Sequence, residues 1–178
     1  MPNINKSLRP SDKSSCIAQN SVYTPTEKTA FIIYGRQNSG KSSTVCYIAE
    51  QLRNYYGTRH TVAVFNDSLQ KDILHTMIVE KDVNKCIGLS SQGDDLPAVL
   101  NNTLSLCLTY SRFLVIAVRD VYSTDPTKSW RIAVEDICKS FGYTTVPIPF
   151  THSPAPPASS IRMTQATNII TSIQKVIP

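Results

Sequence analysis

AFIIYGRQNSGKSST, residues 30–44, is the stretch of this sequence that decides its fold. It opens with five consecutive apolar residues, which is typical of a strand buried on both faces of a parallel sheet. From Gly40 to about Tyr56, apolar residues recur at helical spacing, and Gly57 is a natural stop for that helix. The sequence therefore predicts a buried strand and an amphipathic helix, joined by the short loop GRQNSGKS at residues 35–42.

The loop at residues 35–42 has the spacing of a phosphate-binding loop, with two glycines and a final lysine and serine. Gly35 and Gly40 allow a tight turn and a close approach to phosphate. Successive backbone N–H groups and the positive end of the helix dipole then attract the anion. Lys41 is expected to reach the β- and γ-phosphates, and the Ser42 hydroxyl to hold Mg²⁺.

Further contacts are expected from the rest of the loop and the first helical turn. Ser43 or Thr44, just inside the helix, is placed to donate to the α-phosphate. A glycine–serine turn with an exposed lysine is the alternative interpretation, but the preceding strand and following helix argue against it. The expected nucleotide contacts are Gly35, Arg36, Gln37, Asn38, Ser39, Gly40, Lys41, Ser42 and Ser43.

In this context the chain resembles the P-loop NTPase superfamily, with its Walker A motif at residues 35–42. A looser resemblance covers roughly residues 30–120. There, the segment CIGLSSQGDD at residues 86–95, followed by a helix and a strand ending in AVR, is similar to a group of small bacterial P-loop proteins. The superfamily resemblance implies a nucleoside triphosphate with Mg²⁺ as cofactor, while the looser one implies no particular reaction.

An enzyme of this type needs a carboxylate near Mg²⁺, and ligands of open α/β sheets collect at the carboxyl ends of strands. Three carboxylates follow such predicted ends: Asp94, Asp67 and Asp120. None directly follows four apolar residues, as a Walker B acid would. We favour Asp94, then Asp67, as the metal ligand beside Ser42. The alternative roles are a solvated loop carboxylate or, for Asp94 and Asp95, a cap on the next helix.

Hydrolysis also needs a residue that positions the attacking water, and Gln92 has suitable chemistry. Arg119, at the end of a predicted strand, is placed to neutralise transition-state charge, although an ordinary surface arginine is an equal alternative. The expected catalytic residues are therefore Lys41, Asp94, Gln92 and Arg119. His60, His75 and His152 lie too far apart to suggest a metal site.

Beyond the loop, strands alternate with helices. Strands are predicted at residues 61–65, 73–79, 85–90, 112–119 and 143–146, and helices at residues 97–110, 129–140 and 159–177. A polar turn joins the strands at 73–79 and 85–90, so we expect an antiparallel β-hairpin inserted into a mostly parallel sheet. The pattern predicts an α/β fold, a three-layer α/β/α sandwich of the P-loop NTPase type.

Three regions are expected along the chain. Residues 1–27 are predicted to be a flexible N-terminal arm, and residues 28–150 the nucleotide-binding domain. Five prolines fall between residues 147 and 157, so that stretch is expected to be extended and linker-like. It leads into a C-terminal helix that either packs on the sheet or serves as a partner-binding element. Packing is favoured, so residues 151–178 are expected to lie on or near the domain.

The composition is that of a soluble globular protein, with 41% hydrophobic and 17% charged residues. No apolar run approaches the roughly 18 residues of a membrane span, and the N-terminus lacks the apolar stretch of a secretory signal. A cytoplasmic location is therefore expected. The five scattered cysteines contain no CxxC pair and favour neither a disulfide framework nor a zinc site.

Three functions remain open. The first is Mg-dependent binding and hydrolysis of ATP or another NTP, coupled to a conformational change or a partner, either protein or nucleic acid, with no membrane. The second is a small-molecule kinase, with Asp67 and Arg119 forming an acceptor site. The third is a nucleotide-binding module with little or no hydrolysis. ATP is preferred because the guanine-recognition motif is absent, and protein-kinase signatures are absent as well.

Overall fold

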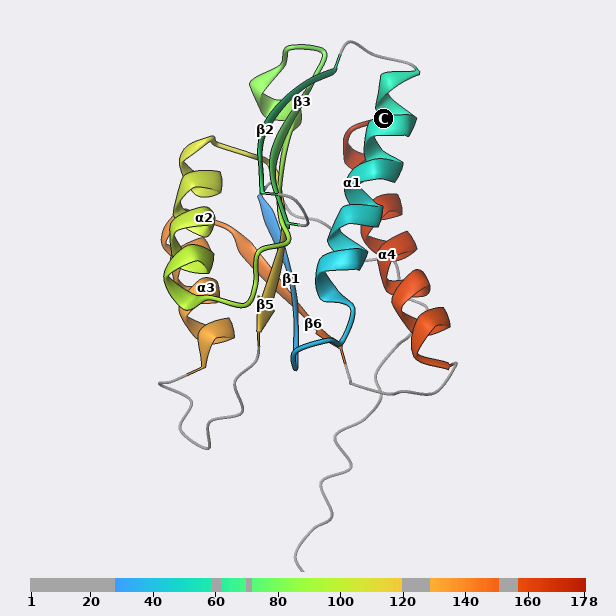
Figure 1. Cartoon of the computed structure of the whole chain (residues 1–178). Helices are drawn as coiled ribbons and strands as arrows, with labels where there is room; N and C mark the ends of the chain where they lie inside the picture. The colour runs from blue at the N-terminus through green and yellow to red at the C-terminus, as the bar shows by residue number, and fades with distance from the viewer. Residues whose placement is uncertain (1–27, 59–61, 70–71, 120–128, 151–156) are drawn as a thin grey trace, which may run out of the picture.

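Strands that are far apart in the sequence assemble into one mixed sheet (Figure 1). The computed structural model describes residues 28–58, 62–69, 72–119, 129–150 and 157–178. Their strands are β1 (Thr29–Gly35), β2 (Val62–Leu69), β3 (Asp72–Val79), β4 (Cys86–Ser90), β5 (Phe113–Arg119) and β6 (Thr144–Phe150). The helices are α1 (Lys41–Gly57), α2 (Leu96–Leu108), α3 (Trp130–Ser140) and α4 (Pro157–Val176), with a 3₁₀ turn at Val83–Lys85.

The six strands follow the order β2-β3-β4-β5-β1-β6. β1 pairs in parallel with β5 on one side and β6 on the other, and β5 pairs in parallel with β4. β3 runs antiparallel to both β4 and β2. The α/β class and the antiparallel hairpin of β3 and β4 are therefore confirmed, and β1 lies between two parallel neighbours, as its continuous apolar run requires.

Two predicted strand ends are wrong. β2 does not stop at residue 65 but continues to Leu69, because it pairs with β3 along its whole length, including Asp67 opposite Leu74. β6 extends to Phe150, into the stretch expected to be a linker, with Pro147 and Pro149 inside the strand. β6 is an edge strand, so only the side that faces β1 needs N–H donors. Pro147 and Pro149 are two residues apart, so both lack an N–H on the same side of the strand, and the donors on the other side remain.

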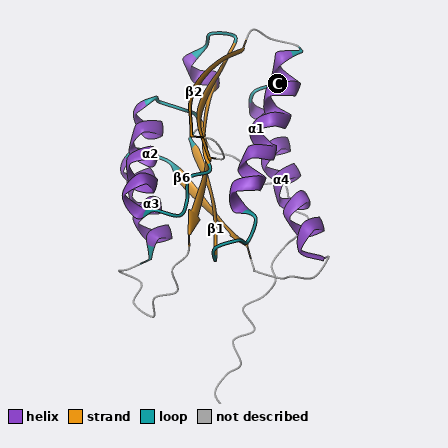
Figure 2. Cartoon of the chain, in the orientation of Figure 1, coloured by secondary structure: helices purple, strands orange, loops and turns teal. Residues whose placement is uncertain are grey.

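The helices cover both faces of the sheet (Figure 2). Phe31 and Ile33 of β1 belong to a buried cluster that includes residues of α1 and α4, such as Ile48. The intervening Ala30 and Ile32 belong to a second cluster that includes residues of α2 and α3. Side chains alternate across a strand, so both faces of β1 are buried. Three cysteines of the described residues are also buried: Cys86, Cys107 and Cys138.

α4 packs against α1, and contacts near both ends of α4 hold α1 in place. Near its C-terminal end, the buried Tyr56 hydroxyl on α1 donates a hydrogen bond of 2.7 Å to the carbonyl oxygen of Ile177. Burial raises the pKa of this hydroxyl well above its ordinary value, and the neighbouring Tyr55 adds to the rise. α4 starts at Pro157, two residues before the predicted start.

No helix in the described part of the chain is long and apolar enough to cross a membrane.

Candidate functional site

The 35–42 loop connects the end of β1 to the start of α1 through a left-handed turn. Gly40, the N-cap residue of α1, has φ of 86° and ψ of 14°. This conformation costs a residue with a Cβ about 1–2 kcal/mol. The Gly40 carbonyl accepts hydrogen bonds from the backbone N–H and the hydroxyl of Thr44, at 3.0 and 2.9 Å. The turn therefore starts α1 directly at Lys41 and leaves the first N–H groups of the helix at the loop.

Gly35 is required by a close approach of two strands. A Cβ at this position would lie 2.2 Å from the carbonyl oxygen of Phe150, the last residue of β6. No side chain fits in that space. The first glycine of the loop therefore allows the carboxyl ends of β1 and β6 to close together at the start of the loop.

Lys41 is held inside the loop that precedes it. Its side chain is buried, and its amine donates a 2.7 Å hydrogen bond to the carbonyl oxygen of Arg36. The Ser39 hydroxyl lies 3.4 Å from the same amine. An ammonium group and a helix N-terminus thus lie together at this loop, and each of them favours an anion there.

Ser42 connects α1 to the end of β4. Its hydroxyl donates a 2.8 Å hydrogen bond to the carbonyl oxygen of Ser91, and the Ser91 hydroxyl accepts one of 2.8 Å from the backbone N–H of Ile73. The buried Ser90 hydroxyl has no hydrogen-bond partner among the described residues. These two serines were not among the predicted site residues. Their only signal in the sequence is the change from apolar to small polar residues at the end of β4.

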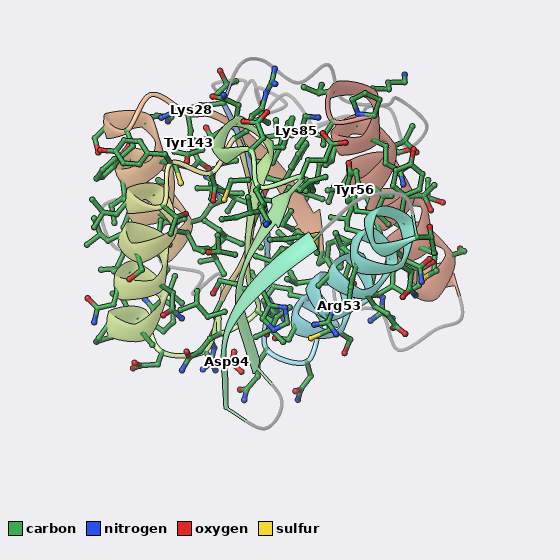
Figure 3. All side chains as sticks on the ribbon, turned by 90° about the horizontal axis from the view of Figure 1, so that it is seen from above. Lys28, Arg53, Tyr56, Lys85, Asp94 and Tyr143 are labelled. Atoms are coloured by element: carbon green, nitrogen blue, oxygen red, sulfur yellow. The ribbon has the colours of Figure 1, made fainter. Side chains whose placement is uncertain are left out.

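The segment after β4 carries two of the predicted site residues, Gln92 and Asp94, and also Asp95, which was expected only as a possible helix cap. Asp94 is exposed to solvent, and Figure 3 labels it. Asp95 is the N-cap of α2, where its carboxylate accepts a 3.1 Å hydrogen bond from the backbone N–H of Ala98. The Gln92 side chain accepts a 3.0 Å hydrogen bond from the amide of Asn102 on α2. Two of the three side chains therefore contribute to the start and packing of α2.

Gly93 lets this segment cross the end of β5. Its Cβ would lie 2.8 Å from the carbonyl oxygen of Ala117, so a larger residue has no room. The Gly93 carbonyl accepts a 2.9 Å hydrogen bond from the backbone N–H of Arg119. The segment that holds Asp94 is thereby fixed to the carboxyl end of β5.

Two arginines reach the loop from other elements. The Arg119 guanidinium donates a 2.8 Å hydrogen bond to the side chain of Gln37, so the structure brings this predicted residue to the loop. The Arg162 guanidinium, from the first turns of α4, donates a 3.1 Å hydrogen bond to the carbonyl oxygen of Ser39. Arg162 was missed because nothing in the sequence places α4 beside the loop.

The remaining candidates lie elsewhere. Asp67 is inside edge strand β2, which is separated from β1 by β3, β4 and β5, so the expectation that it follows a strand end beside the loop is wrong. Asp120 lies outside the described residues. Within the described part of the chain, no group of three or more His, Cys, Asp or Glu residues could hold a metal. Mg²⁺ is commonly held by one or two protein ligands together with substrate phosphates, so Ser42 and Asp94 suffice as candidates.

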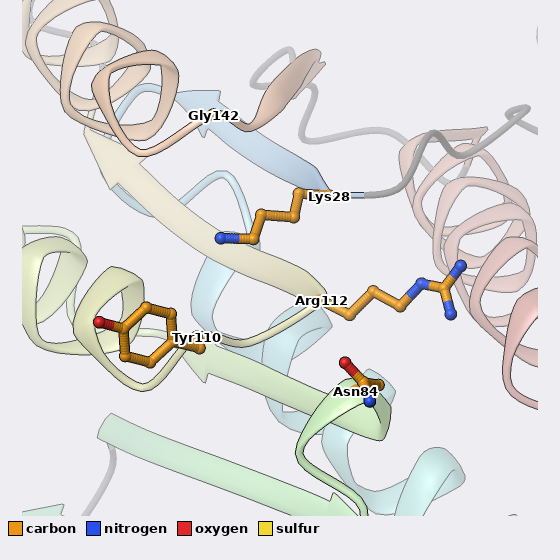
Figure 4. Close-up of a pocket in the computed structure, with 5 residues that line it drawn as sticks. All are labelled: Lys28, Asn84, Tyr110, Arg112 and Gly142. Carbon is orange, nitrogen blue, oxygen red and sulfur yellow. The ribbon is translucent and has the colours of Figure 1, made fainter.

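A pocket of about 530 Å³ lies at the end of the sheet opposite the 35–42 loop. It is lined by Lys28, Asn84, Tyr110, Arg112 and Gly142 (Figure 4). The Lys28 amine points towards the Tyr110 side, whereas the Arg112 guanidinium points away from it. These cations do not converge, and the pocket lies at the amino ends of the parallel strands. Ligands of open α/β sheets collect at the carboxyl ends, so the loop is the better candidate site despite the larger volume here.

The buried Lys41 ammonium, the Arg119 and Arg162 guanidinium groups and the Ser42 hydroxyl thus lie in or beside the 35–42 loop, at the carboxyl end of β1. The chain matches no protein-family model, no curated protein and no solved structure.

Proposed function

We propose that this chain binds ATP or another nucleoside triphosphate with Mg²⁺ on the 35–42 loop and hydrolyses it, as a P-loop NTPase with a three-layer α/β/α fold. The observation that carries the proposal is the buried Lys41 ammonium, enclosed by its own loop at the N-terminus of α1. A buried cation is stabilised by an anion, and the loop offers backbone N–H donors for one. Arg119 and Arg162, both hydrogen-bonded to the loop, add positive charge around it.

Mg²⁺ is expected to bind Ser42 and Asp94. The Ser42 hydroxyl has only one donor hydrogen, which goes to the Ser91 carbonyl, so an oxygen lone pair remains for a metal. Asp94 is exposed and lies in the segment after β4, to which Ser42 is hydrogen-bonded at Ser91. Water and the phosphate oxygens would complete the coordination, as is usual for Mg²⁺.

Coupling to a conformational change is supported by the connections of the loop. Ser42 is bonded to the segment after β4, and Gln37 to the end of β5. A metal or phosphate that draws Ser42 or Arg119 away from these partners would alter the positions of residues 91–95. We propose that this segment responds to the nucleotide and communicates with a partner, either protein or nucleic acid.

A binding module with little or no turnover is the alternative that has its own support. Gln92, the candidate for positioning water, is hydrogen-bonded to Asn102, and Asp95 caps α2. These bonds hold both side chains against α2. The free thiols of the described residues fit a reducing compartment, so we propose a cytoplasmic location.

Phosphate release from ATP and GTP tests the proposal, with and without DNA, RNA and common nucleosides. Lys41→Ala should abolish binding and release, while Lys139→Ala, which changes an exposed lysine on α3, should leave both unchanged. Release without an acceptor supports hydrolysis, and transfer only to an added nucleoside supports a kinase. Tight binding without turnover supports the binding module. Equal binding by the wild type and Lys41→Ala would sink the assignment of the loop.

A further inference from the structure

A small pocket of about 220 Å³ lies between α1 and α4, beside the 35–42 loop. Its walls come from two segments that are distant in the sequence. On the α1 side the pocket is lined by Gly40, Ser43, Thr44 and Tyr47, and on the α4 side by Arg162, Met163 and Ala166. The pocket therefore begins where the phosphate loop ends.

This continuity determines which part of a ligand would reach the pocket. Lys41 marks the position expected for the β- and γ-phosphates, whereas Ser43 and Thr44 are expected at the α-phosphate. Ser43 and Thr44 also line the pocket. A nucleoside attached to the α-phosphate would consequently extend into the space between α1 and α4.

The walls have the chemistry of a base-stacking site. Tyr47 is partly buried and offers an aromatic ring, and Met163, which is 45% exposed, offers a polarisable thioether opposite it. Ala166 is fully buried and leaves room between them. The volume is below the roughly 300 Å³ at the lower end of pockets for drug-sized ligands, which suits one planar ring system better than a whole nucleotide.

Arg162 fixes the distance between the two walls. Its guanidinium donates to the Ser39 carbonyl at 3.1 Å and lies directly over Gly40, where a Cβ would be only 2.1 Å from it. This contact holds the first turns of α4, which carry Met163, against the loop. Arg162 is thus a positioning residue for the wall that Met163 forms.

We infer that this pocket binds the base and ribose of the nucleotide whose phosphates lie on the 35–42 loop, with the base held against Tyr47 and Met163. The inference rests on the proposed function and adds the C-terminal helix to the nucleotide site. Recognition by stacking accepts any base, because every base has a π-face. ATP and GTP should therefore bind with affinities within about tenfold of each other, and both should bind more tightly than tripolyphosphate.

Calorimetric titrations of the full chain with Mg·ATP, Mg·GTP and Mg·tripolyphosphate test this inference. Tyr47→Ala and Met163→Glu should each weaken binding of both nucleotides by about tenfold, the size expected for losing a stacking contact. Both should leave the tripolyphosphate affinity unchanged within about twofold, since the loop is intact. Tyr47→Phe should retain nucleotide affinity. Met163 is exposed enough that its substitution should not prevent folding, which keeps the test valid if Tyr47→Ala is unstable.

Tyr110→Ala is the matched control, because Tyr110 is a tyrosine that is 72% exposed and lines the pocket at the opposite end of the sheet. It should not change any of the three affinities. Weaker nucleotide binding by Tyr110→Ala, or equal binding of ATP and tripolyphosphate by the wild type, would overturn the pocket assignment and leave the phosphate loop standing. If the wild type binds none of the three ligands, the proposed function fails and this inference fails with it.

Discussion

The amine of Lys41 and the carbonyl oxygen of Arg36 lie 2.7 Å apart, within a loop that places them five residues apart in sequence. The hydrogen bond closes the loop around its own cation. A neutral carbonyl is a weaker partner for an ammonium group than a charged phosphate oxygen. A triphosphate should therefore replace Arg36 as the partner of Lys41, and the ligand should stabilise the folded protein.

Thermal unfolding with and without Mg·tripolyphosphate measures this replacement. A ligand at about 100 times its Kd stabilises a protein by about 2.7 kcal/mol. For a chain of this length that corresponds to an increase in Tm of about 5–10 °C. Lys41→Met keeps the apolar part of the side chain but removes the amine, and should show no such increase. A full increase with this variant would mean that the phosphate binds elsewhere.

Asp94 and Asp95 are adjacent carboxylates for which the structure predicts opposite effects. Asp95→Ala removes the cap of α2 and should lower the free energy of unfolding by about 1 kcal/mol, without changing the Mg²⁺ requirement of nucleotide binding. Asp94→Ala changes an exposed side chain and should alter stability by less than about 0.5 kcal/mol. It should raise the Mg²⁺ concentration at half-maximal nucleotide binding. If Asp95→Ala instead raised the Mg²⁺ requirement and Asp94→Ala did not, Asp95 would be the metal ligand.

His75 on β3 should make stability depend on pH. Burial lowers the pKa of this imidazole, and the positive charge of Arg53 on α1 lowers the pKa further. Glu50 and Arg53 line a small pocket together with His75. The unfolded chain therefore takes up a proton near pH 6.5, before the folded protein does. The contribution of His75 to the free energy of unfolding is therefore fully present above about pH 6.5. It is lost as the pH falls through the lowered pKa, by up to about 1.4 kcal/mol per pH unit.

Urea unfolding at about pH 7.5 and about pH 5.5 checks this effect in the wild type and in His75→Gln, which does not titrate. The wild type should lose more stability than the variant between these two values. Arg53→Ala should reduce the pH dependence of the wild type in part, because it removes the second cause of the lowered pKa. Equal losses in the wild type and His75→Gln would show that other groups account for the dependence on acid.

The sequence predicted those parts of the fold whose interactions are local. β1, the loop and α1 are contiguous, so periodicity and glycine spacing were enough to find them. The hairpin of β3 and β4 is joined by a short polar turn and was found for the same reason. The extent of β2 and β6 was not predicted, because each strand is lengthened by pairing with a neighbour that a local pattern does not reveal.

The candidate site was predictable only along one segment of chain. Residues 35–42 identify the candidate loop, but the partner of Ser42 is 49 residues away and Arg162 is 123 residues from Ser39. These contacts depend on the order of strands and on how α4 packs against α1, which no spacing in the sequence encodes. Asp67 was misplaced for the same reason, since its strand lies at the far edge of the sheet.

Gly40 and Arg162 should be energetically coupled. Gly40→Ala adds a Cβ to a residue with φ of 86°, which costs about 1–2 kcal/mol, and the new carbon would also displace the Arg162 guanidinium from the Ser39 carbonyl. Arg162→Ala alone loses that hydrogen bond, at about 1 kcal/mol. Because both variants lose the same contact, the double variant should be less destabilised than the sum of the two, by about 0.5–1 kcal/mol.

Gly142 provides the control for this coupling. It has φ of 81°, yet nothing lies within 4 Å of a Cβ placed on it, so Gly142→Ala adds backbone strain without displacing a neighbour. Combined with Arg162→Ala, it should give an additive loss in urea unfolding, since the two residues lie at opposite ends of the sheet. Additivity in the Gly40 pair as well would contradict the contact between α4 and the loop. Coupling in the Gly40 pair alone would show in solution that the C-terminal helix is held by the 35–42 loop.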